Sequence, residues 1–182
     1  MKHALIVGGT GMLANVSHWL VANGYHVSVI GRNQVRMEKF LERIDSKEVT
    51  PIIVDYINEK ELRERLQQSI RLNHPINLVV AWIHTIAPDA LKAICHEVSL
   101  YHYEWSLFHV LGSSSNIEDI KQKTAVPPFC QYHQIQLGFI NEGNQSRWLT
   151  HQEISNGVIE AIQQKKSVHT VGVIEPWEKR PY

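Results

Sequence analysis

A glycine-rich segment near the start of the chain, Gly8-Gly9-Thr10-Gly11, restricts the possible folds more than any other part of the sequence. It follows a short apolar run at residues 3–7, which predicts a strand. After it, apolar residues recur with helical spacing from residue 12 to residue 20, and Asn23-Gly24 then supplies a typical helix stop. The segment therefore joins a strand to a helix.

Together with Ala14, this segment reads G-x-G-x-x-A, the pattern found where a dinucleotide binds to a parallel sheet. In that pattern Gly9 permits the tight turn, Gly11 lets the backbone approach a pyrophosphate, and Ala14 allows the helix to pack closely on the strand. The unpaired N–H groups at the start of the helix and the positive end of its dipole would hold the phosphates. The alternative is a glycine-rich turn that only packs a helix on a sheet.

Short apolar runs alternate with segments of helical periodicity along the whole chain, which is typical of a mostly parallel α/β sheet. The expected strands are residues 3–7, 25–30, 49–54, 76–83, 107–111, 133–140 and 168–174. Helix starts are expected at residue 12, before Met37, at Asn58, at Thr85–Pro88, at Ser115 and at Thr150. Residues 101–105 are expected to form a loop or the lead-in to a strand. Because no repeat or linker divides the chain, we expect residues 1–182 to form one domain.

Composition excludes several classes of function. The chain has 18 Lys and Arg against 18 Asp and Glu, so no net charge draws it to nucleic acid or to a membrane surface. Its two cysteines, Cys95 and Cys130, are too few for a disulfide framework and fit a reducing cytoplasm. The run 4–7 is too short for a signal segment or a membrane span. The eleven histidines are scattered without paired metal-ligand spacing, so we expect no metal site.

The end of the second expected strand bears on the choice between NAD and NADP. An NAD site usually places an acidic residue there to bind the ribose 2′-hydroxyl, but this chain reads Gly31-Arg32-Asn33. Without a carboxylate to repel a 2′-phosphate, the guanidinium of Arg32 can bind it, and Arg36 lies one turn further on. The sequence therefore favours NADP over NAD, the alternative being an ordinary surface arginine at a helix start.

The order of elements, the glycine loop, Asp55 after the third strand and the serines after the fifth strand resemble the short-chain dehydrogenase/reductase family. The resemblance covers nearly the whole chain and implies a three-layer Rossmann fold, with a doubly wound parallel sheet in the strand order 3-2-1-4-5-6-7. It places Asp55 near the adenine and the ends of strands four and five near the nicotinamide. The expected cofactor-binding residues are Gly8, Gly9, Thr10, Gly11, Met12, Leu13, Arg32, Asn33, Arg36, Asp55, Tyr56, Ala81 and Trp82.

The chain departs from the family in its second half. Where the family has Asn-Ala-Gly after strand four, it reads Ala81-Trp82-Ile83-His84. The family's serine fits Ser113 or Ser114, but the sixteen residues between Ser114 and Gln131 contain no tyrosine for a Tyr-x-x-x-Lys motif. The nearest tyrosine, Tyr132, has Gln136 in place of the lysine. We therefore expect a shortened catalytic helix, with Tyr132 opening a strand.

A substitute proton donor follows the fourth strand. His84 lies at the carboxyl edge of the sheet, where such folds bind ligands, and imidazole titrates near neutral pH. The hypothesis is that His84 donates the proton while Ser113 or Ser114 binds the substrate carbonyl. The alternative is that His84 only caps the next helix or packs beside Trp82. The candidate catalytic residues are thus Ser113, Ser114, His84 and Tyr132.

Two functions from different classes remain open. The first is an NADP-dependent oxidoreductase of the short-chain type, which moves a hydride to or from a small carbonyl or alcohol substrate. The second is a non-catalytic NADP(H)-binding sensor or regulatory protein, because phosphate binding by the glycine loop implies nothing about hydride chemistry. An enzyme acting on a nucleotide sugar is a weaker third possibility. The sequence leaves open whether the chain forms a homo-oligomer and what residues 175–182 do.

Overall fold

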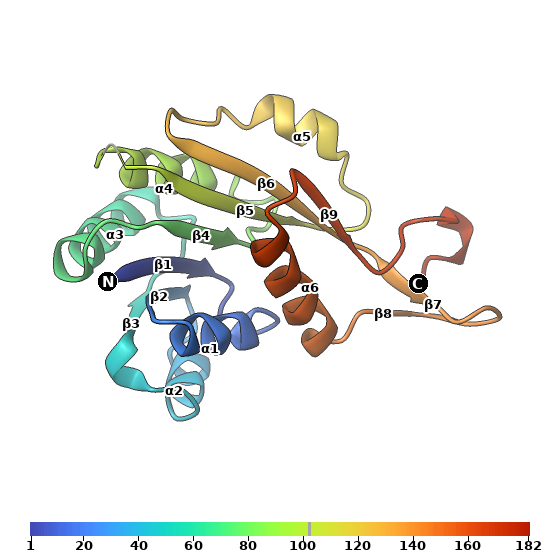
Figure 1. The fold of residues 1–182 in the computed structure, drawn as a ribbon, viewed down its shortest axis with the longest axis horizontal. Coiled ribbons are helices and arrows are strands. Elements are labelled where there is room, and N and C mark those ends of the chain that lie inside the picture. The colour runs from blue at the N-terminus through green and yellow to red at the C-terminus, as the bar shows by residue number, and fades with distance from the viewer. Residues whose placement is uncertain (102) are drawn as a thin grey trace.

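Seven parallel strands form the central sheet of the computed structural model, which describes residues 1–101 and 103–182. The strand order is β3-β2-β1-β4-β5-β6-β9, as the family resemblance implied (Figure 1). The strands are β1 (Lys2–Val7), β2 (Tyr25–Gly31), β3 (Val49–Ile53), β4 (Leu78–Ala81), β5 (Trp105–Leu111), β6 (Cys130–Leu137) and β9 (Val168–Val171). The helices are α1 (Ala14–Ala22), α2 (Gln34–Leu41), α3 (Glu59–Asn73), α4 (Pro88–Ser99), α5 (Ile117–Lys123) and α6 (His151–Gln164).

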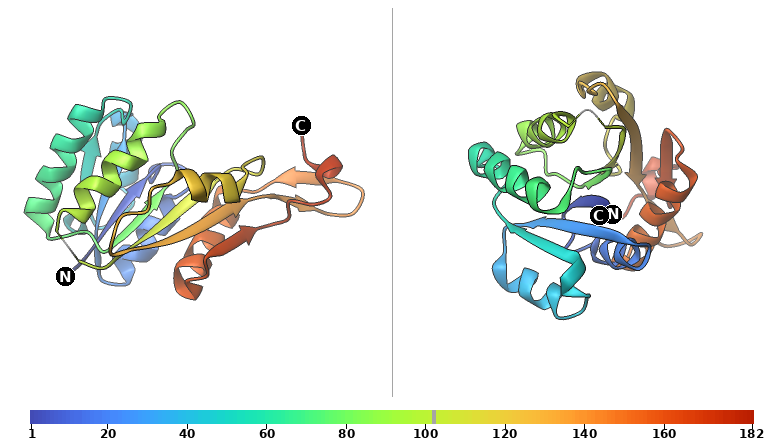
Figure 2. Two further views of the ribbon diagram at one scale, coloured as in Figure 1. Left: turned by 90° about the horizontal axis from the view of Figure 1, so that it is seen from above. Right: turned by 60° about the vertical axis from the view of Figure 1, so that its left-hand side comes forward.

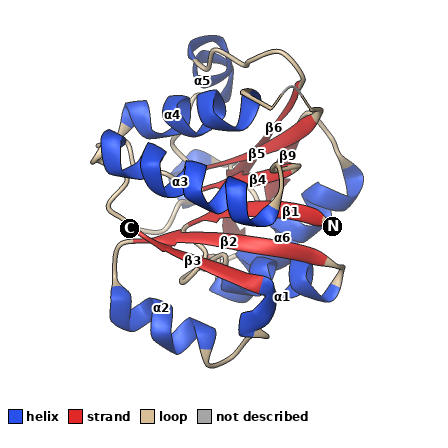
Figure 3. Cartoon of the chain, turned by 90° about the vertical axis from the view of Figure 1, so that its left-hand side faces the viewer, coloured by secondary structure: helices blue, strands red, loops and turns tan. Residues whose placement is uncertain are grey.

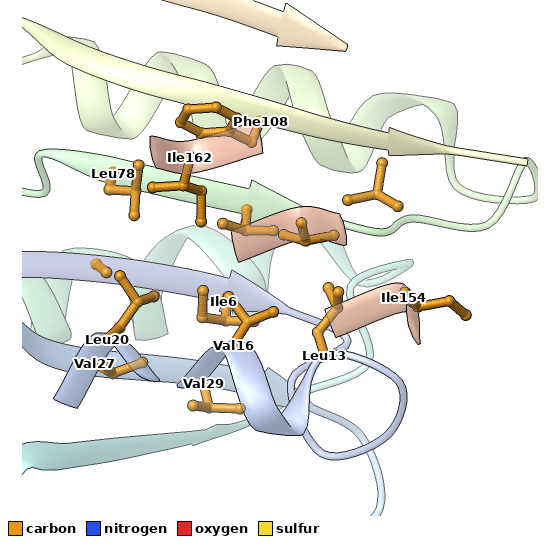
Figure 4. Packing of buried hydrophobic residues seen from close by; sticks show 14 of the residues in the cluster. Ile6, Leu13, Val16, Leu20, Val27, Val29, Leu78, Phe108, Ile154 and Ile162 are labelled. Atoms are coloured by element: carbon orange, nitrogen blue, oxygen red, sulfur yellow. The ribbon is translucent and has the colours of Figure 1, made fainter. Parts of the chain in front are cut away.

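Two apolar layers cover the sheet, so the structure is a three-layer α/β Rossmann fold (Figure 3). Successive strand residues face opposite sides, and β1 therefore contributes Ile6 to one layer and Leu5 and Val7 to the other. The first layer packs against α1, α2 and α6, and Figure 4 shows Val16 of α1 and Ile162 of α6 within it. The second layer packs against α3 and α4.

A hairpin outside the main sheet was not expected from the sequence. The predicted strand 133–140 is instead two elements: β6 ends at Leu137, and β7 (Phe139–Asn141) pairs with β8 (Ser146–Trp148). The break falls at Gly138, where a Cβ would lie 2.1 Å from the carbonyl oxygen of Val173, so only glycine fits. The hairpin extends beyond the end of the sheet beside the C-terminal segment (Figure 2).

Most expected helix starts are confirmed, and the differences have local causes. Asn58 and Thr150 cap α3 and α6, since each side chain accepts the N–H of the residue three positions later. The cap of α5 is Asn116, which accepts the N–H of Asp119 at 3.0 Å, rather than Ser115. Helix α4 begins at Pro88 and leaves Thr85 outside.

Other boundaries of the central sheet also differ from the prediction, and β9 ends at Val171 rather than at residue 174. Strand β4 covers Leu78–Ala81, whereas residues 76–83 were expected, although the N–H of Trp82 still donates to the carbonyl of Val7 at 3.2 Å. Strand β5 begins at Trp105, within the stretch 101–105 expected to lead into it. His102 of that stretch lies outside the described residues. None of the described helices is long and apolar enough to cross a membrane.

Candidate functional site

A cleft of about 460 Å³ opens at the carboxyl ends of the first four strands. Its position agrees with the general rule for open parallel sheets, because the strand order reverses between β1 and β4 and ligands bind at that reversal. The residues that line it are Gly8, Thr10, Gly11, Met12, Ile30, Gly31, Arg32, Asn33, Arg36, Asp55, Tyr56, Ile57, Trp82, His84, Ile86 and His151. Most of the predicted cofactor-binding residues therefore share one cleft.

The three glycines of the loop have different structural requirements. Gly8 adopts a φ of +88°, which disfavours any residue with a Cβ. A Cβ on Gly9 would lie 2.8 Å from Cγ1 of Val29 and 2.9 Å from Cγ2 of Ile6, so packing against the sheet requires this glycine. A Cβ on Gly11 would meet nothing within 4 Å. The turn therefore depends on Gly8 rather than on Gly9, and Gly11 faces open space in the cleft.

The arginines lie at the end of β2 and in the first turn of α2. The Asn33 side chain accepts the backbone N–H of Arg36 at 2.9 Å and so caps this helix. Nη1 of Arg32 lies 3.9 Å from Oδ2 of Asp55, but the Arg32 side chain is 72% exposed. Such an exposed pair is weak, and an incoming anion can displace the carboxylate. Both guanidinium groups are therefore available to the cleft.

The opposite wall of the cleft combines aromatic and apolar side chains. The hydroxyl of Tyr56 accepts the backbone N–H of His84 at 3.2 Å, which ties the loop after β4 to the loop after β3. Ile57 and Ile86 line the same wall although both are more than half exposed. The ring of His84 meets the indole of Trp82 edge to face, with the ring centroids 6.1 Å apart. This wall can cover a flat ring.

Three of the expected cofactor residues do not line the cleft. Gly9 packs against the sheet, and the side chains of Leu13 and Ala81 are fully buried in the two apolar layers. Leu13 is also the N-cap of α1 and makes no side-chain hydrogen bond to it, while the carbonyl of Gly11 accepts the N–H of Ala14 and the carbonyl of Leu13 accepts the N–H of Val16. Gly9, Leu13 and Ala81 support the loop by packing beneath it and do not line the cleft.

The two candidate serines follow β5 but lie outside the lining of the cleft. Ser113 is half-buried and Ser114 is exposed. The Gln136 side chain of β6 donates to the carbonyl oxygens of Ser113 and Ser115 at 3.4 and 3.0 Å. These bonds fix the backbone of the serine loop to the sheet. Neither bond involves the hydroxyl of Ser113 or Ser114.

Tyr132 lies near the start of β6, whereas Gln136 lies near the end of this strand. Tyr132 is therefore a strand residue and not a helix residue. It pairs with Leu107, four residues before Leu111 where β5 ends, which corresponds to roughly 13 Å along the strand. Its hydroxyl lies 2.9 Å from Nδ1 of His109. The structure therefore does not bring Tyr132 together with the serines or with His84. The helix between β5 and β6, α5, has only seven residues.

His151, Ile57 and Ile86 line the cleft although the sequence did not single them out. His151 is the first residue of α6, and the capping pattern of Thr150 predicted only that a helix starts there. Two contacts bring this start beside α1: Ser155 donates to the carbonyl of Met12 at 2.8 Å, and Asn15 donates to Gln152 at 2.9 Å. No local sequence pattern predicts that the start of α6 packs beside α1. Among the described residues, no cluster of three histidine, cysteine or acidic side chains is suited to hold a metal ion.

Comparisons by structure give a consistent result. A short-chain dehydrogenase/reductase from Serratia marcescens superposes with a TM-score of 0.75 at 12% identity, covering 94% of this chain and 96% of its own. The bulky-bulky ketone specific alcohol dehydrogenase from Comamonas testosteroni gives 0.71 at 14% identity, with 98% and 90% coverage. An actinorhodin polyketide ketoreductase variant with NADPH gives 0.73 at 10% identity, with 94% and 95% coverage.

The chain has the short-chain dehydrogenase/reductase fold. At these sequence identities the structural similarity establishes the fold alone, and this is the fold that the sequence resemblance implied. No protein-family model matches the chain, and no curated protein matches it by sequence. The reductase fold is therefore established by the arrangement of strands and helices, while activity has to be argued from the cleft.

Proposed function

We propose that this chain is an NADP-dependent oxidoreductase that acts on a small carbonyl or alcohol substrate. The observation that carries the proposal is the convergence of the glycine loop and two arginines, Arg32 and Arg36, on one cleft at the strand reversal. NADP, when bound, supplies or accepts the hydride, and the chain itself supplies binding, orientation and the proton. We further propose that the protein works in the cytoplasm, which its free thiols Cys95 and Cys130 favour.

The residues present fit such a dinucleotide. The open space beside Gly11 is what a backbone needs if it is to approach a pyrophosphate closely. Arg32 and Arg36 provide positive charge for a 2′-phosphate, and no acidic residue ends β2 to repel it. Tyr56, Ile57 and Ile86 offer the apolar wall for an adenine ring.

The proton is assigned to His84. Its imidazole is exposed and lines the cleft, so it is accessible both to solvent and to a bound molecule. General acid–base catalysis of this kind contributes roughly 10²- to 10⁴-fold. Ser113 and Ser114 are proposed to bind the substrate carbonyl at the end of β5.

The second candidate is a non-catalytic NADP(H)-binding protein. Two observations favour it: the Tyr132 hydroxyl is hydrogen-bonded to His109 between β5 and β6, and neither Tyr132 nor the serines line the cleft. Under this alternative the chain binds the dinucleotide and signals its presence to a partner. Binding alone therefore cannot distinguish the two candidates.

Turnover measurements on three proteins separate them. Consumption of NADPH is followed by absorbance with a panel of small aldehydes and ketones, for the wild type, His84→Ala and the control His96→Ala, which changes an α4 histidine that contacts Arg63 and Glu97 and does not line the cleft. The oxidoreductase proposal expects turnover in the wild type and the control, with at least a tenfold loss in His84→Ala and unchanged NADPH affinity. Unchanged turnover in His84→Ala would remove its assigned role. NADPH binding without turnover on any substrate would favour the second candidate.

A further inference from the structure

Trp82 is the bulkiest side chain at the point where the strand order reverses. Its backbone N–H donates to Val7 at the end of β1, so the residue is anchored between β1 and β4. Its side chain is half-buried and packs against the apolar layer on the side of α1 and α6. The indole therefore occupies a fixed place at the strand ends rather than projecting into solvent.

The indole reaches from the glycine loop to the loop after β5. A Cβ on Gly8 would lie 3.5 Å from Cβ of Trp82 and 3.6 Å from its Cδ1. At the far end of the ring, a Cβ on Gly112 would lie 3.9 Å from Cη2 of Trp82. Gly112 directly precedes Ser113. The ring thus lies between the glycine loop and the loop after β5. A dinucleotide with its pyrophosphate at the glycine loop would have to pass this ring to reach the serines.

Trp82 is the lining residue whose side chain comes near Gly112. Residues from the ends of β1, β2, β3 and β4 and the loops after them contribute to the lining, as does His151 at the start of α6, whereas residues 105–115, all within the described part of the chain, contribute none. A dinucleotide at such a site crosses the reversal point, with one nucleotide on each side. In this structure the cleft lies on the side that holds the arginines, and the Trp82 indole stands between it and Gly112, the residue before Ser113.

We infer that Trp82 determines how much of NADP(H) the cleft accepts. This inference rests on the proposed binding of NADP(H). With the indole in place, the cleft binds the 2′-phospho-ADP half through Arg32, Arg36 and the glycine loop. The nicotinamide ring then adds little to the binding affinity. Access of that ring to the serines requires the indole to turn away. The size of the side chain at position 82 is therefore a specificity determinant.

Calorimetric titration with two probes tests this directly. The probes are NADPH and 2′-phospho-ADP-ribose, which lacks the nicotinamide ring. For the wild type we expect dissociation constants within about threefold of each other, because the ring adds few contacts. For Trp82→Ala we expect NADPH to bind about tenfold more tightly while 2′-phospho-ADP-ribose changes less than about twofold. Trp177→Ala, in the C-terminal segment away from the cleft, is the control and should leave both constants unchanged.

Trp82→Phe keeps the inference testable if the alanine variant does not fold. Phenylalanine retains the contact at Gly8 but lacks the part of the ring that approaches Gly112, so NADPH should again gain affinity selectively. The wild type could instead bind NADPH more tightly than 2′-phospho-ADP-ribose, and either variant could lose this difference. That result would overturn the inference and make Trp82 a nicotinamide contact. Equal affinities in all proteins would also overturn it. Failure of both probes to bind any protein would instead remove the proposed function.

Discussion

The hydroxyl oxygen of Tyr132 and Nδ1 of His109 lie 2.9 Å apart between two neighbouring strands of the sheet. Burial lowers the pKa of His109 to about 4 and raises the pKa of Tyr132. The imidazole is therefore neutral and the phenol protonated at neutral pH. The pair is a structural hydrogen bond between β5 and β6, and it holds the Tyr132 hydroxyl away from the cleft.

We expect Tyr132→Phe to lower stability and to leave function intact. Loss of the hydroxyl leaves a buried imidazole nitrogen without this partner, which costs about 1–3 kcal/mol. NADPH affinity and any turnover should stay within about twofold of the wild type, since the residue touches neither serine. Urea unfolding and NADPH titration measure the two effects. A large loss of turnover at unchanged stability would return Tyr132 to the catalytic candidates.

Gly9 and Gly11 form a matched pair for separating packing from binding. Gly9→Ala forces a methyl group against Ile6 and Val29, and we expect a loss of about 1–3 kcal/mol in the free energy of unfolding. Gly11→Ala places its methyl group in open space, so stability should change by less than about 0.5 kcal/mol while NADPH binding weakens. Thermal unfolding and calorimetric titration distinguish these outcomes. Equal destabilisation by both changes would contradict the assigned roles.

His3 gives the folded protein a defined response to acid. The ring is fully buried, with Nδ1 2.8 Å from the carbonyl oxygen of His74 and Nε2 2.8 Å from Oγ of Ser28. A carbonyl oxygen can only accept, so Nδ1 carries the proton and the Ser28 hydroxyl donates to Nε2. Burial lowers the pKa of His3 to about 4. A second proton would break the bond from Ser28.

The sign of the pH effect follows from this lowered pKa. An unfolded histidine has a pKa of about 6.5, so between that value and about 4 the unfolded chain binds more protons than the folded one. Stability due to His3 is fully present above pH 6.5 and is lost as the pH falls toward 4, by up to about 3 kcal/mol. His109 acts in the same direction.

Urea unfolding at several pH values between 7.5 and 4.5 measures this loss (~1.36 kcal/mol for each unit of pKa difference). His3→Gln should be less stable at neutral pH and should show a shallower decline with acid than the wild type. His151→Gln, which changes an exposed histidine, is the control and should keep the wild-type slope. An unchanged slope in His3→Gln would contradict the assignment.

A buried carboxylate joins α3 to α4. The Glu97 side chain is 3% exposed and accepts Nη1 of Arg63 at 2.7 Å and Nε2 of Gln67 at 2.9 Å. Burial alone would raise the pKa of Glu97, but the hydrogen bonds from Gln67, Arg63 and His96 and the charge of Arg63 together lower it by more. The charge is therefore retained and depends on its partners.

Removal of one partner should leave this charge uncompensated. We expect Arg63→Met to reduce the free energy of unfolding by about 3 kcal/mol. Arg65→Met is the matched control on the same helix, because its pair with Glu61 is exposed and should contribute less than about 0.5 kcal/mol. Chemical denaturation of both variants decides the point. Similar small losses in the two would show that Glu97 keeps its charge without Arg63.

Much of the fold followed from local patterns. Apolar runs such as 25–30 and the caps at Asn58 and Thr150 are properties of short segments, and the structure confirms the strand order implied by the resemblance. The hairpin of β7 and β8 was missed because the break in the strand depends on Val173, which approaches Gly138 from a distant part of the chain. Such a contact leaves no trace in local periodicity.

The cleft was predictable only in part for the same reason. The glycine loop, Arg32 and Asp55 each follow a strand end, so the topology brings them to one edge. The contribution of His151 depends on the packing of α6 beside α1, and the position of the Trp82 indole depends on its contacts with two separate loops. Tertiary contacts of this kind require the structure.

The central claim is that the cleft binds NADP(H) through the glycine loop and the two arginines. Calorimetric titration of the wild type with NADPH and with NADH, repeated on the double variant Arg32→Ala with Arg36→Ala, tests it most directly. We expect NADPH to bind the wild type at least about tenfold more tightly than NADH, and this preference to vanish in the double variant. Equal affinity for the two dinucleotides in the wild type, or no binding of either, would contradict the claim.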